Sequence, residues 1–179
     1  MTRIIAGALR GRRLEAPRGT GTRPTSDKVR QALFDVLGQF FEGGAVLDLY
    51  AGSGALALEA LSRGCDRAVC VESDRDAAEI IRRNAAALGL GDRVHVLGGR
   101  VEDVLPGLPR GAFALVFVDP PYAEGPDAAL PMLAGCLAPG GRAATEHDAR
   151  RPPPDAPRGL RLVDRRRFGS TGVSIYACD

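Results

Sequence analysis

Four consecutive residues, Asp119-Pro120-Pro121-Tyr122, carry groups that could activate an amino group on an aromatic base. Such a nitrogen is a poor nucleophile because its lone pair is delocalised into the ring. The carboxylate of Asp119 and the main-chain carbonyl of Pro120 could accept its two N–H hydrogen bonds and so aim the lone pair at an electrophile. The prolines would stiffen this backbone, and Tyr122 could stack on a flipped or unpaired base. We therefore predict Asp119, Pro120, Pro121 and Tyr122 as catalytic residues for a reaction at an exocyclic amine.

The position of this motif separates it from an ordinary turn, which Asp-Pro and Pro-Pro would also fit. The motif directly follows a predicted strand over 113–118. A glycine-rich segment, Asp48-Leu49-Tyr50-Ala51-Gly52-Ser53-Gly54, follows another predicted strand over 45–50 and opens a helix. Ligands of open α/β sheets bind at the carboxyl ends of the strands. Both segments should therefore face one crevice.

The glycine-rich segment predicts a cofactor loop, because glycine lets the backbone turn tightly and approach a bulky ligand. With Ala57 the segment also matches the dinucleotide fingerprint, so the glycines alone do not choose the cofactor. Asp48 could orient the loop or meet the amino group of a cationic ligand, whereas a pyrophosphate would gain nothing from it. Glu72 ends the second strand, where a carboxylate suits the ribose hydroxyls of either cofactor and could also be a solvated or capping acid.

These acids favour S-adenosylmethionine over a nicotinamide dinucleotide. After the third strand, Arg100 and Val101 are expected beside the adenine, which would meet backbone amides and an apolar side chain. The predicted cofactor-binding residues are Asp48, Tyr50, Gly52, Ser53, Gly54, Glu72, Arg100, Val101 and Asp119.

Short apolar strands that alternate with helices predict a parallel sheet covered on both faces. Strands are expected over 45–50, 68–72, 93–97, 113–118 and 141–146, with helices over 54–63, 74–88, 101–105 and 127–137 between them. A further helix should run from Thr25 or Ser26 to about Phe41. Strands over 161–168 and 173–177 are too close for a crossover helix, so they should form an antiparallel hairpin. The expected class is α/β, a Rossmann-like methyltransferase fold with a mostly parallel seven-stranded sheet, a C-terminal antiparallel hairpin and a small N-terminal hairpin extension.

The net charge of +2 hides an uneven distribution. Residues 1–30 hold eight basic residues against only Glu15 and Asp27. This asymmetry indicates a polyanion-binding arm, although a solvated arginine-rich surface would look the same. We expect a basic hairpin or arm for RNA contact over 1–24 and a methyltransferase domain over 25–179, in one compact unit. The predicted nucleic-acid contacts are Arg10, Arg12, Arg13, Arg23 and Arg30. A second cluster, Arg165-Arg166-Arg167, has no assigned role, and Phe168 fits either a pocket wall or the core.

The sequence also argues against several classes of protein. No apolar run reaches the roughly 20 residues of a membrane span, and the N-terminus lacks a signal peptide. We expect a cytoplasmic monomer that does not bind membranes. The cysteines, Cys65, Cys70, Cys136 and Cys178, form no CxxC pair. They predict small buried side chains and no metal site.

With these residues in place, the chain resembles the bacterial RsmD family of 16S rRNA guanine-N2 methyltransferases, from Arg3 to Tyr176. The resemblance rests on the cofactor loop, Glu72, the Asp119–Tyr122 motif and N-terminal residues. Those N-terminal residues are Arg3-Ile4-Ile5-Ala6-Gly7, Arg10-Gly11-Arg12, Arg23-Pro24-Thr25, Asp27, Arg30 and Phe34. The resemblance implies methyl transfer to the N2 amine of a guanine in 16S rRNA of the small ribosomal subunit. Tyr50 is a conservative departure, because phenylalanine is expected there.

Three other activities stay open on the sequence. An adenine-N6 methyltransferase acting on DNA or RNA could use the same motif, although a separate target-recognition domain is absent. A nicotinamide dehydrogenase would need a substrate domain and would leave the Asp119–Tyr122 motif unexplained. A non-catalytic RNA-binding factor could keep the fold, but the intact motif argues against loss of activity.

Overall fold

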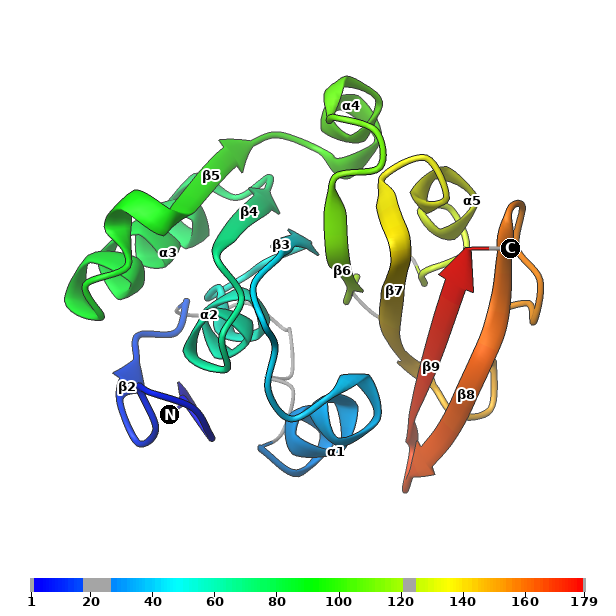
Figure 1. Ribbon diagram of the computed structural model, residues 1–179, viewed down its shortest axis with the longest axis horizontal. Coiled ribbons are helices and arrows are strands. Elements are labelled where there is room, and N and C mark those ends of the chain that lie inside the picture. Colours follow the sequence, from blue (N-terminus) through cyan, green and yellow to red (C-terminus); the bar gives the residue numbers. More distant parts are fainter. Residues whose placement is uncertain (1, 18–26, 121–124, 179) are drawn as a thin grey trace.

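A seven-stranded sheet forms the centre of the protein (Figure 1). The computed structural model describes residues 2–17, 27–120 and 125–178. Along the sheet the strand order is β5-β4-β3-β6-β7-β9-β8. The pairs among β5, β4, β3, β6 and β7 are parallel, while β9 is antiparallel to β7 and to β8. The strands are β3 (Ala45–Leu49), β4 (Arg67–Glu72), β5 (Val94–Gly98), β6 (Phe113–Val118), β7 (Leu137–Asp148), β8 (Leu160–Phe168) and β9 (Thr171–Cys178). The predicted fold class is confirmed.

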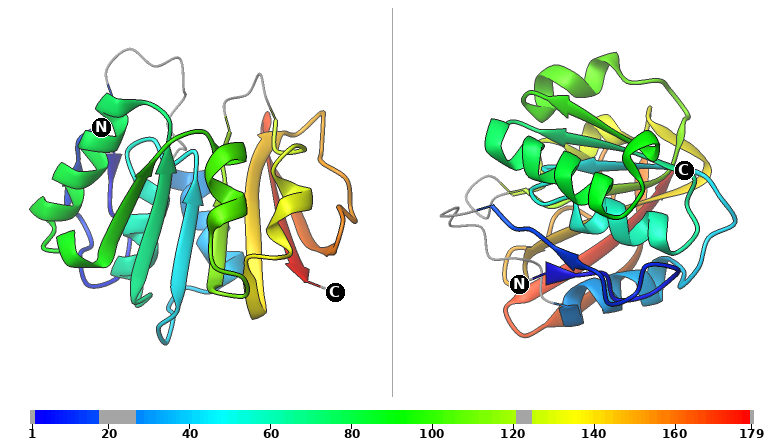
Figure 2. Two further views of the ribbon diagram at one scale, coloured as in Figure 1. Left: turned by 90° about the horizontal axis from the view of Figure 1, so that it is seen from above. Right: turned by 90° about the vertical axis from the view of Figure 1, so that its left-hand side faces the viewer.

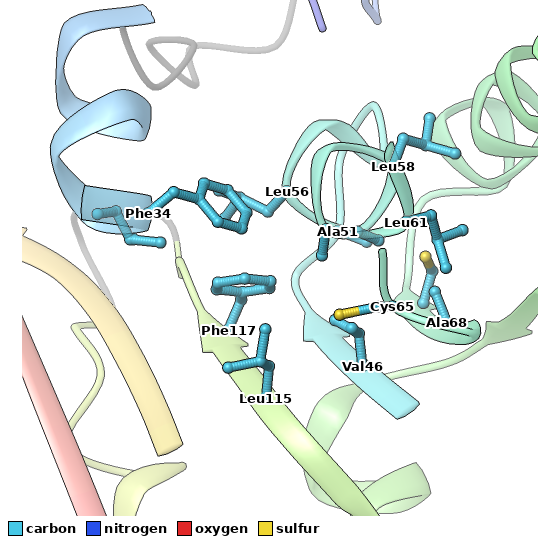
Figure 3. Close-up of a cluster of buried hydrophobic side chains, with 14 of the residues drawn as sticks. Phe34, Val46, Ala51, Leu56, Leu58, Leu61, Cys65, Ala68, Leu115 and Phe117 are labelled. Atoms are coloured by element: carbon cyan, nitrogen blue, oxygen red, sulfur yellow. The ribbon is translucent and has the colours of Figure 1, made fainter. Parts of the chain in front are cut away.

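Helices cover both faces of this sheet, and each face has its own core. One core packs α1 (Asp27–Leu37), α2 (Ala55–Ser62) and α3 (Arg75–Ala87) against the strands. In it, the rings of Phe34 and Phe117 pack in an edge-to-face arrangement, with ring centroids 5.7 Å apart (Figure 3). The other core involves α4 (Val101–Val104) and α5 (Leu130–Leu133). Two short 3-10 helices, η1 (Gly91–Arg93) and η2 (Leu105–Gly107), complete the connections.

Two helices are shorter than the sequence pattern predicts. Helix α1 ends at Leu37 rather than near Phe41, because Gly38 takes a φ of 129° that no helix continues. The predicted helix over 127–137 is reduced to α5, and β7 begins at Leu137. There the carbonyl of Cys136 accepts hydrogen bonds from two main-chain amides at the start of β6, so the chain has already joined the sheet. Apolar side chains at helical spacing did not reveal this early change.

The N-terminal extension is a small hairpin of β1 (Thr2–Arg3) and β2 (Arg13–Leu14), which pair in antiparallel register. It is fastened to α2 by side chains of that helix. The Glu59 carboxylate accepts hydrogen bonds from the amides of Ile5 (2.7 Å) and Ala6 (2.9 Å), and Ser62 Oγ accepts one from the Leu9 amide (3.0 Å). The right-hand view of Figure 2 shows the dark blue hairpin lying along the layer that contains α1 and α2. The hairpin is thus part of the packed body.

Within the described ranges, no helix is long and apolar enough to cross a membrane. The cysteines Cys65, Cys70 and Cys136 are buried, as expected for small core side chains, and Cys178 is half-buried.

Candidate active site

The candidate site lies where β3, β4 and β6 end. In the register of the sheet, Leu49 of β3 pairs with Val71 of β4 and with Val118 of β6. The residues that follow these three are Tyr50, Glu72 and Asp119, so they come to the same edge of the sheet. Parallel pairing therefore joins the predicted cofactor loop and the first residue of the predicted catalytic motif at one place.

The cofactor loop is a tight turn that requires unusual backbone angles. Gly52 and Gly54 have positive φ values of 57° and 77°, and Tyr50 has a φ of 64°. Positive φ is uncommon for a residue with a side chain and costs on the order of 1–3 kcal/mol. The turn is closed by hydrogen bonds from the Ala51 amide to the Val71 carbonyl (3.1 Å) and from the Gly54 amide to the Ala51 carbonyl (2.7 Å). Strain at Tyr50 is typical of backbone that is shaped for a ligand.

Asp48 lies near the end of β3 and stabilises the start of α2, the helix that follows the cofactor loop. Its side chain is 2% exposed, and Oδ2 accepts a hydrogen bond from the Ala57 amide (3.1 Å) in the first turn of α2. The residue before that helix, Gly54, offers no side-chain cap, so Asp48 takes over the capping role from a neighbouring strand. Burial raises the pKa of Asp48 to about 8, against the opposing effect of the Ala57 hydrogen bond. The nearby charges of Asp119 and Glu72 raise this pKa further.

We expect this pKa to make the protein less stable as the pH rises. A carboxyl group whose folded pKa lies above its unfolded value keeps its proton longer in the native state. The stabilisation is complete below about pH 4 and is lost as the pH rises through about 8. Asp48→Asn keeps an acceptor oxygen but cannot ionise. Urea unfolding at pH 5, 6, 7 and 8 should therefore show the wild type losing stability relative to Asp48→Asn, and parallel pH profiles would contradict this.

Glu72 is held in place by the same loop. Its Oε2 accepts a hydrogen bond from the Gly52 amide (2.8 Å), and its Oε1 accepts one from the Asp74 amide (2.9 Å). Each carboxylate oxygen has a second lone pair, so the group can still accept hydrogen bonds from two hydroxyls of a ligand. Glu72 is half-buried at the edge, as a ribose-binding acid requires. The donors and acceptors at this edge therefore fit the ribose of S-adenosylmethionine.

Asn84 of α3 is a supporting residue that the sequence reasoning missed. Its side chain is 4% exposed. Nδ2 donates hydrogen bonds to the carbonyls of Ser53 and Glu15 (3.0 Å each), and Oδ1 accepts one from the Glu15 amide (2.8 Å). One side chain thus fastens the cofactor loop to the N-terminal extension. The available signal was a polar residue on the apolar face of a helix, between Ile81 and Leu88.

The expected adenine contacts are only partly supported by where the side chains lie. Val101 is 3% exposed and packs in the second core, so its side chain offers little surface to a ring. Arg100 is exposed and pairs with Glu102 across 3.4 Å. The turn between Gly98 and Val101 still follows β5 at the correct edge, next to Glu72 in register. Main-chain groups of this turn are the better candidates for adenine recognition.

The catalytic motif is described at its first two residues. Asp119 is half-buried and Pro120 is buried, directly after β6. Asp119 lies close enough to Asp48 to raise its pKa. Pro121 and Tyr122 lie outside the described residues. Phe168 is half-buried and packs against the core that contains α1, α2 and α3, which favours a core role over a pocket wall.

The predicted nucleic-acid contacts do not gather at the site. Arg10, Arg12 and Arg13 are exposed, and among the described residues none of them forms an ion pair. Arg12 donates a hydrogen bond to the Ala87 carbonyl (2.6 Å), at the last residue of α3. Arg23 lies outside the described residues.

Arg30 requires a correction. Its side chain is 1% exposed and it donates hydrogen bonds to the Arg3 carbonyl (2.6 Å) and to Asp27 Oδ1 (2.9 Å). The guanidinium therefore fastens α1 to the hairpin and does not present itself to a phosphate. The basic count of residues 1–30 included this internal charge, because composition does not distinguish buried from exposed arginines.

Comparison with known proteins identifies the family. The family model described as "Conserved hypothetical protein 95" matches residues 2–177. YlbH of Bacillus subtilis (strain 168) is 37% identical over 179 residues, which covers 97% of each chain. "Ribosomal RNA small subunit methyltransferase D" of Escherichia coli (strain K12) is 42% identical over 125 residues, covering 69% of this chain and 61% of that protein. The structure of Escherichia coli yhhF superposes with a TM-score of 0.84 at 32% identity, covering 99% of this chain and 98% of that one. The chain therefore belongs to the Conserved hypothetical protein 95 family of S-adenosylmethionine-dependent methyltransferases.

Proposed function

We propose that this enzyme transfers a methyl group from S-adenosylmethionine to the exocyclic N2 amine of a guanine in 16S rRNA of the small ribosomal subunit. The observation that carries the proposal is the convergence of Asp119-Pro120 with the cofactor loop and Glu72 at one sheet edge. A base amine held by Asp119 and the Pro120 carbonyl would be placed beside the bound cofactor.

The residues of this chain would act by orienting the amine. S-adenosylmethionine supplies an electrophilic methyl group on a sulfonium. Asp119 accepts one N–H hydrogen bond and the Pro120 carbonyl accepts the other, which leaves the nitrogen lone pair directed at the methyl carbon. The amine would take the methyl group from the sulfonium, which would leave as a neutral thioether, and water or Asp119 would accept the proton that the amine loses. Fixing these atoms in line provides the main acceleration.

The electrostatics of the site favour a cationic cofactor over a pyrophosphate. The carboxylates of Glu72 and Asp119 lie close to the buried Asp48, and each raises the pKa of Asp48. Like charges in one place disfavour further negative charge. A sulfonium and an ammonium would reduce this repulsion, whereas the pyrophosphate of a nicotinamide dinucleotide would increase it. This supports methyl transfer over the dehydrogenase alternative.

The choice of RNA rests on the relatives and on the exposed basic residues. The Escherichia coli relative is named as a small-subunit ribosomal RNA methyltransferase, and YlbH is named as an rRNA methyltransferase with no subunit given. The exposed Arg10, Arg12 and Arg13 would bind RNA phosphates and so contribute affinity rather than base choice. Because Ala8 and Leu9 in the bend of the hairpin bind Ser62 at the end of α2, a phosphate contact of Arg10 would be made at a distance from the target base.

Methyl incorporation tests the substrate class. Small ribosomal subunits that lack the modification, free 16S rRNA, large subunits and duplex DNA would each be incubated with the enzyme and S-adenosylmethionine carrying a labelled methyl group. We expect label in RNA of the small subunit and background levels in large subunits and DNA. Incorporation into DNA instead would contradict the proposal and favour the adenine alternative. S-adenosylmethionine binding with no incorporation into any of these would favour a non-catalytic role.

A further inference from the structure

The end of β8 carries three consecutive arginines, Arg165, Arg166 and Arg167, at the outer edge of the sheet. Strand β7 is antiparallel to β9, and β9 is antiparallel to β8, so β8 runs in the same direction as β7 and β6. The last residues of β8 therefore lie at the same sheet edge as Asp119-Pro120. The arginines are at the catalytic edge although more than forty residues separate them from that motif.

The strand register shows which of these arginines is level with Asp119 along the strand direction. The β6 residue before Asp119 pairs with Thr145, Thr145 pairs with Ser174, and Ser174 pairs with Arg165. The next row across the sheet therefore runs from Asp119 to Arg166. Three strand spacings of about 4.8 Å separate β6 from β8, which is about 14 Å. Phosphates of nucleotides that flank a base held at Asp119 can reach across such a distance.

Arg165 is an internal anchor. Its side chain donates hydrogen bonds to Ser174 Oγ (2.9 Å), Asp155 Oδ1 (2.8 Å) and the Pro153 carbonyl (2.6 Å). It fixes the 150–157 segment against β8 and β9. The guanidinium of Arg165 therefore stabilises the fold, and these three contacts are all within the protein.

His147 makes the end of the hairpin rigid. Its Nδ1 donates to the Asp148 carbonyl (2.9 Å), so the neutral ring accepts at Nε2 from the Ser174 hydroxyl (2.9 Å). Burial lowers the pKa of His147, in keeping with a neutral ring. The ring lies over Gly172, where any side chain would collide with it. Only glycine is accommodated, and the β8–β9 turn is held against β7.

Arg166 and Arg167 lie near the end of β8, beside the β8–β9 turn, and their side chains are exposed. The side chain of Arg166 is 49% exposed and pairs with Asp164 at 3.1 Å. Arg167 is exposed, its Nε donates to the Gly169 carbonyl (2.9 Å), and it has no ion pair with any residue in the described ranges. Both guanidiniums thus keep donors for an additional acceptor, since each carries five N–H groups.

The bend of the N-terminal hairpin lies farther from the site than the end of the hairpin does. The bend between β1 and β2 is hydrogen-bonded to Ser62 and Ala87, the last residues of α2 and α3. Helix α2 begins at the catalytic edge and runs away from it, so Ala8 and Leu9, which bind its last residue, lie at the other end of the strands. Glu15, after β2, is instead held by Asn84 next to Ser53 of the cofactor loop. In the left-hand view of Figure 2, the dark blue bend and the start of the red strand β9 lie at opposite ends of the sheet.

We propose that Arg166 and Arg167 bind the phosphates of nucleotides that flank the target base, and so form the RNA-binding surface next to the catalytic motif. This inference rests on the proposed RNA substrate. Arginine is suited to this contact because its planar fork matches phosphate oxygens and keeps its charge at all physiological pH values. The contact would set the register of the RNA on the enzyme rather than the chemistry.

The double variant Arg166→Ala/Arg167→Ala tests the inference, with Arg161→Ala as its matched control. Arg161 is an exposed arginine near the start of the same strand, at the opposite edge of the sheet. The double variant should raise the KM for small subunits on the order of tenfold and reduce the salt slope of RNA binding by about one to two. Its kcat and its S-adenosylmethionine affinity should remain those of the wild type. Arg161→Ala should change none of these. Arg167→Ala alone, which breaks no ion pair among the described residues, should show part of the effect.

Two controls separate the possible failures. If the wild type methylates small subunits and the double variant behaves like Arg161→Ala, the phosphate contact is wrong and the proposed function stands. If the wild type methylates no RNA, the proposed function itself fails. Binding of free 16S rRNA, measured with S-adenosylhomocysteine present, distinguishes RNA from protein contacts. Weakened binding to whole subunits with unchanged binding to free RNA would overturn the assignment and indicate a contact with a ribosomal protein.

Discussion

Asp119→Ala is expected to reduce kcat/KM for methyl transfer by about 10²- to 10³-fold, and to change S-adenosylmethionine affinity by less than tenfold. Asp119 directly follows β6 and would accept one of the two amine hydrogen bonds that orient the nucleophile. A neutral methyl group cannot accept this bond, so the lone pair would stay delocalised in the base. The measurement is a steady-state methyl-transfer assay on unmodified small subunits, with calorimetric titration of the cofactor.

Two further variants serve as comparisons for the activity of Asp119→Ala. Asp119→Asn keeps one acceptor oxygen and should retain more activity than Asp119→Ala. Asp92→Ala removes an exposed acid from η1, ahead of β5 and at the opposite sheet edge, and should be close to wild type. Full activity of Asp119→Ala would exclude the proposed role of this carboxylate.

Glu59→Ala is expected to lower the free energy of unfolding by about 3–5 kcal/mol, because it leaves a buried charge without its partner. Arg63 Nε donates to Glu59 Oε1 at 2.7 Å, and the two side chains are 1% and 0% exposed. The same carboxylate accepts the amide hydrogen bonds of Ile5 and Ala6. The Arg63 guanidinium also lies 4.4 Å from the centroid of the Phe34 ring. One substitution would thus disturb α1, α2 and the hairpin together.

Urea unfolding followed by circular dichroism measures this loss, which corresponds to a fall in Tm on the order of 10 °C. Glu79→Ala is the matched control, because Glu79 pairs with Arg82 on the surface of α3 and is 58% exposed. Exposed pairs contribute about 0–1 kcal/mol. If Glu59→Ala were no more harmful than Glu79→Ala, the Glu59–Arg63 pair would not be what fastens the hairpin to the body.

The sheet and the meeting of its functional loops could be predicted from the sequence. Apolar strands alternating with helices imply parallel pairing, and parallel pairing brings the residues after β3, β4 and β6 to one edge. The common edge at which Asp48, Glu72 and Asp119 lie therefore follows from the sequence. Their identification required only the order of the elements.

Residues whose partners are distant main-chain groups could not be predicted in this way. Glu59, Asn84 and Arg30 each bind the N-terminal extension, and the sequence carries no local signal of where that extension packs. The positions of Arg10 and Arg12 could not be predicted for the same reason, because they depend on how the hairpin packs on α2. Arg166 illustrates the converse, since only the strand register brings it level with Asp119.

The identity of the methylated nucleoside decides whether the enzyme acts on the N2 amine of guanine. Unmodified small subunits would be treated with the enzyme and S-adenosylmethionine, digested to nucleosides and analysed by mass spectrometry, with Asp119→Ala in parallel. We expect N2-methylguanosine with the wild-type enzyme and at most a trace of it with Asp119→Ala. N6-methyladenosine in place of N2-methylguanosine would contradict the assignment of the guanine amine while leaving the orienting role of Asp119 and Pro120 in place.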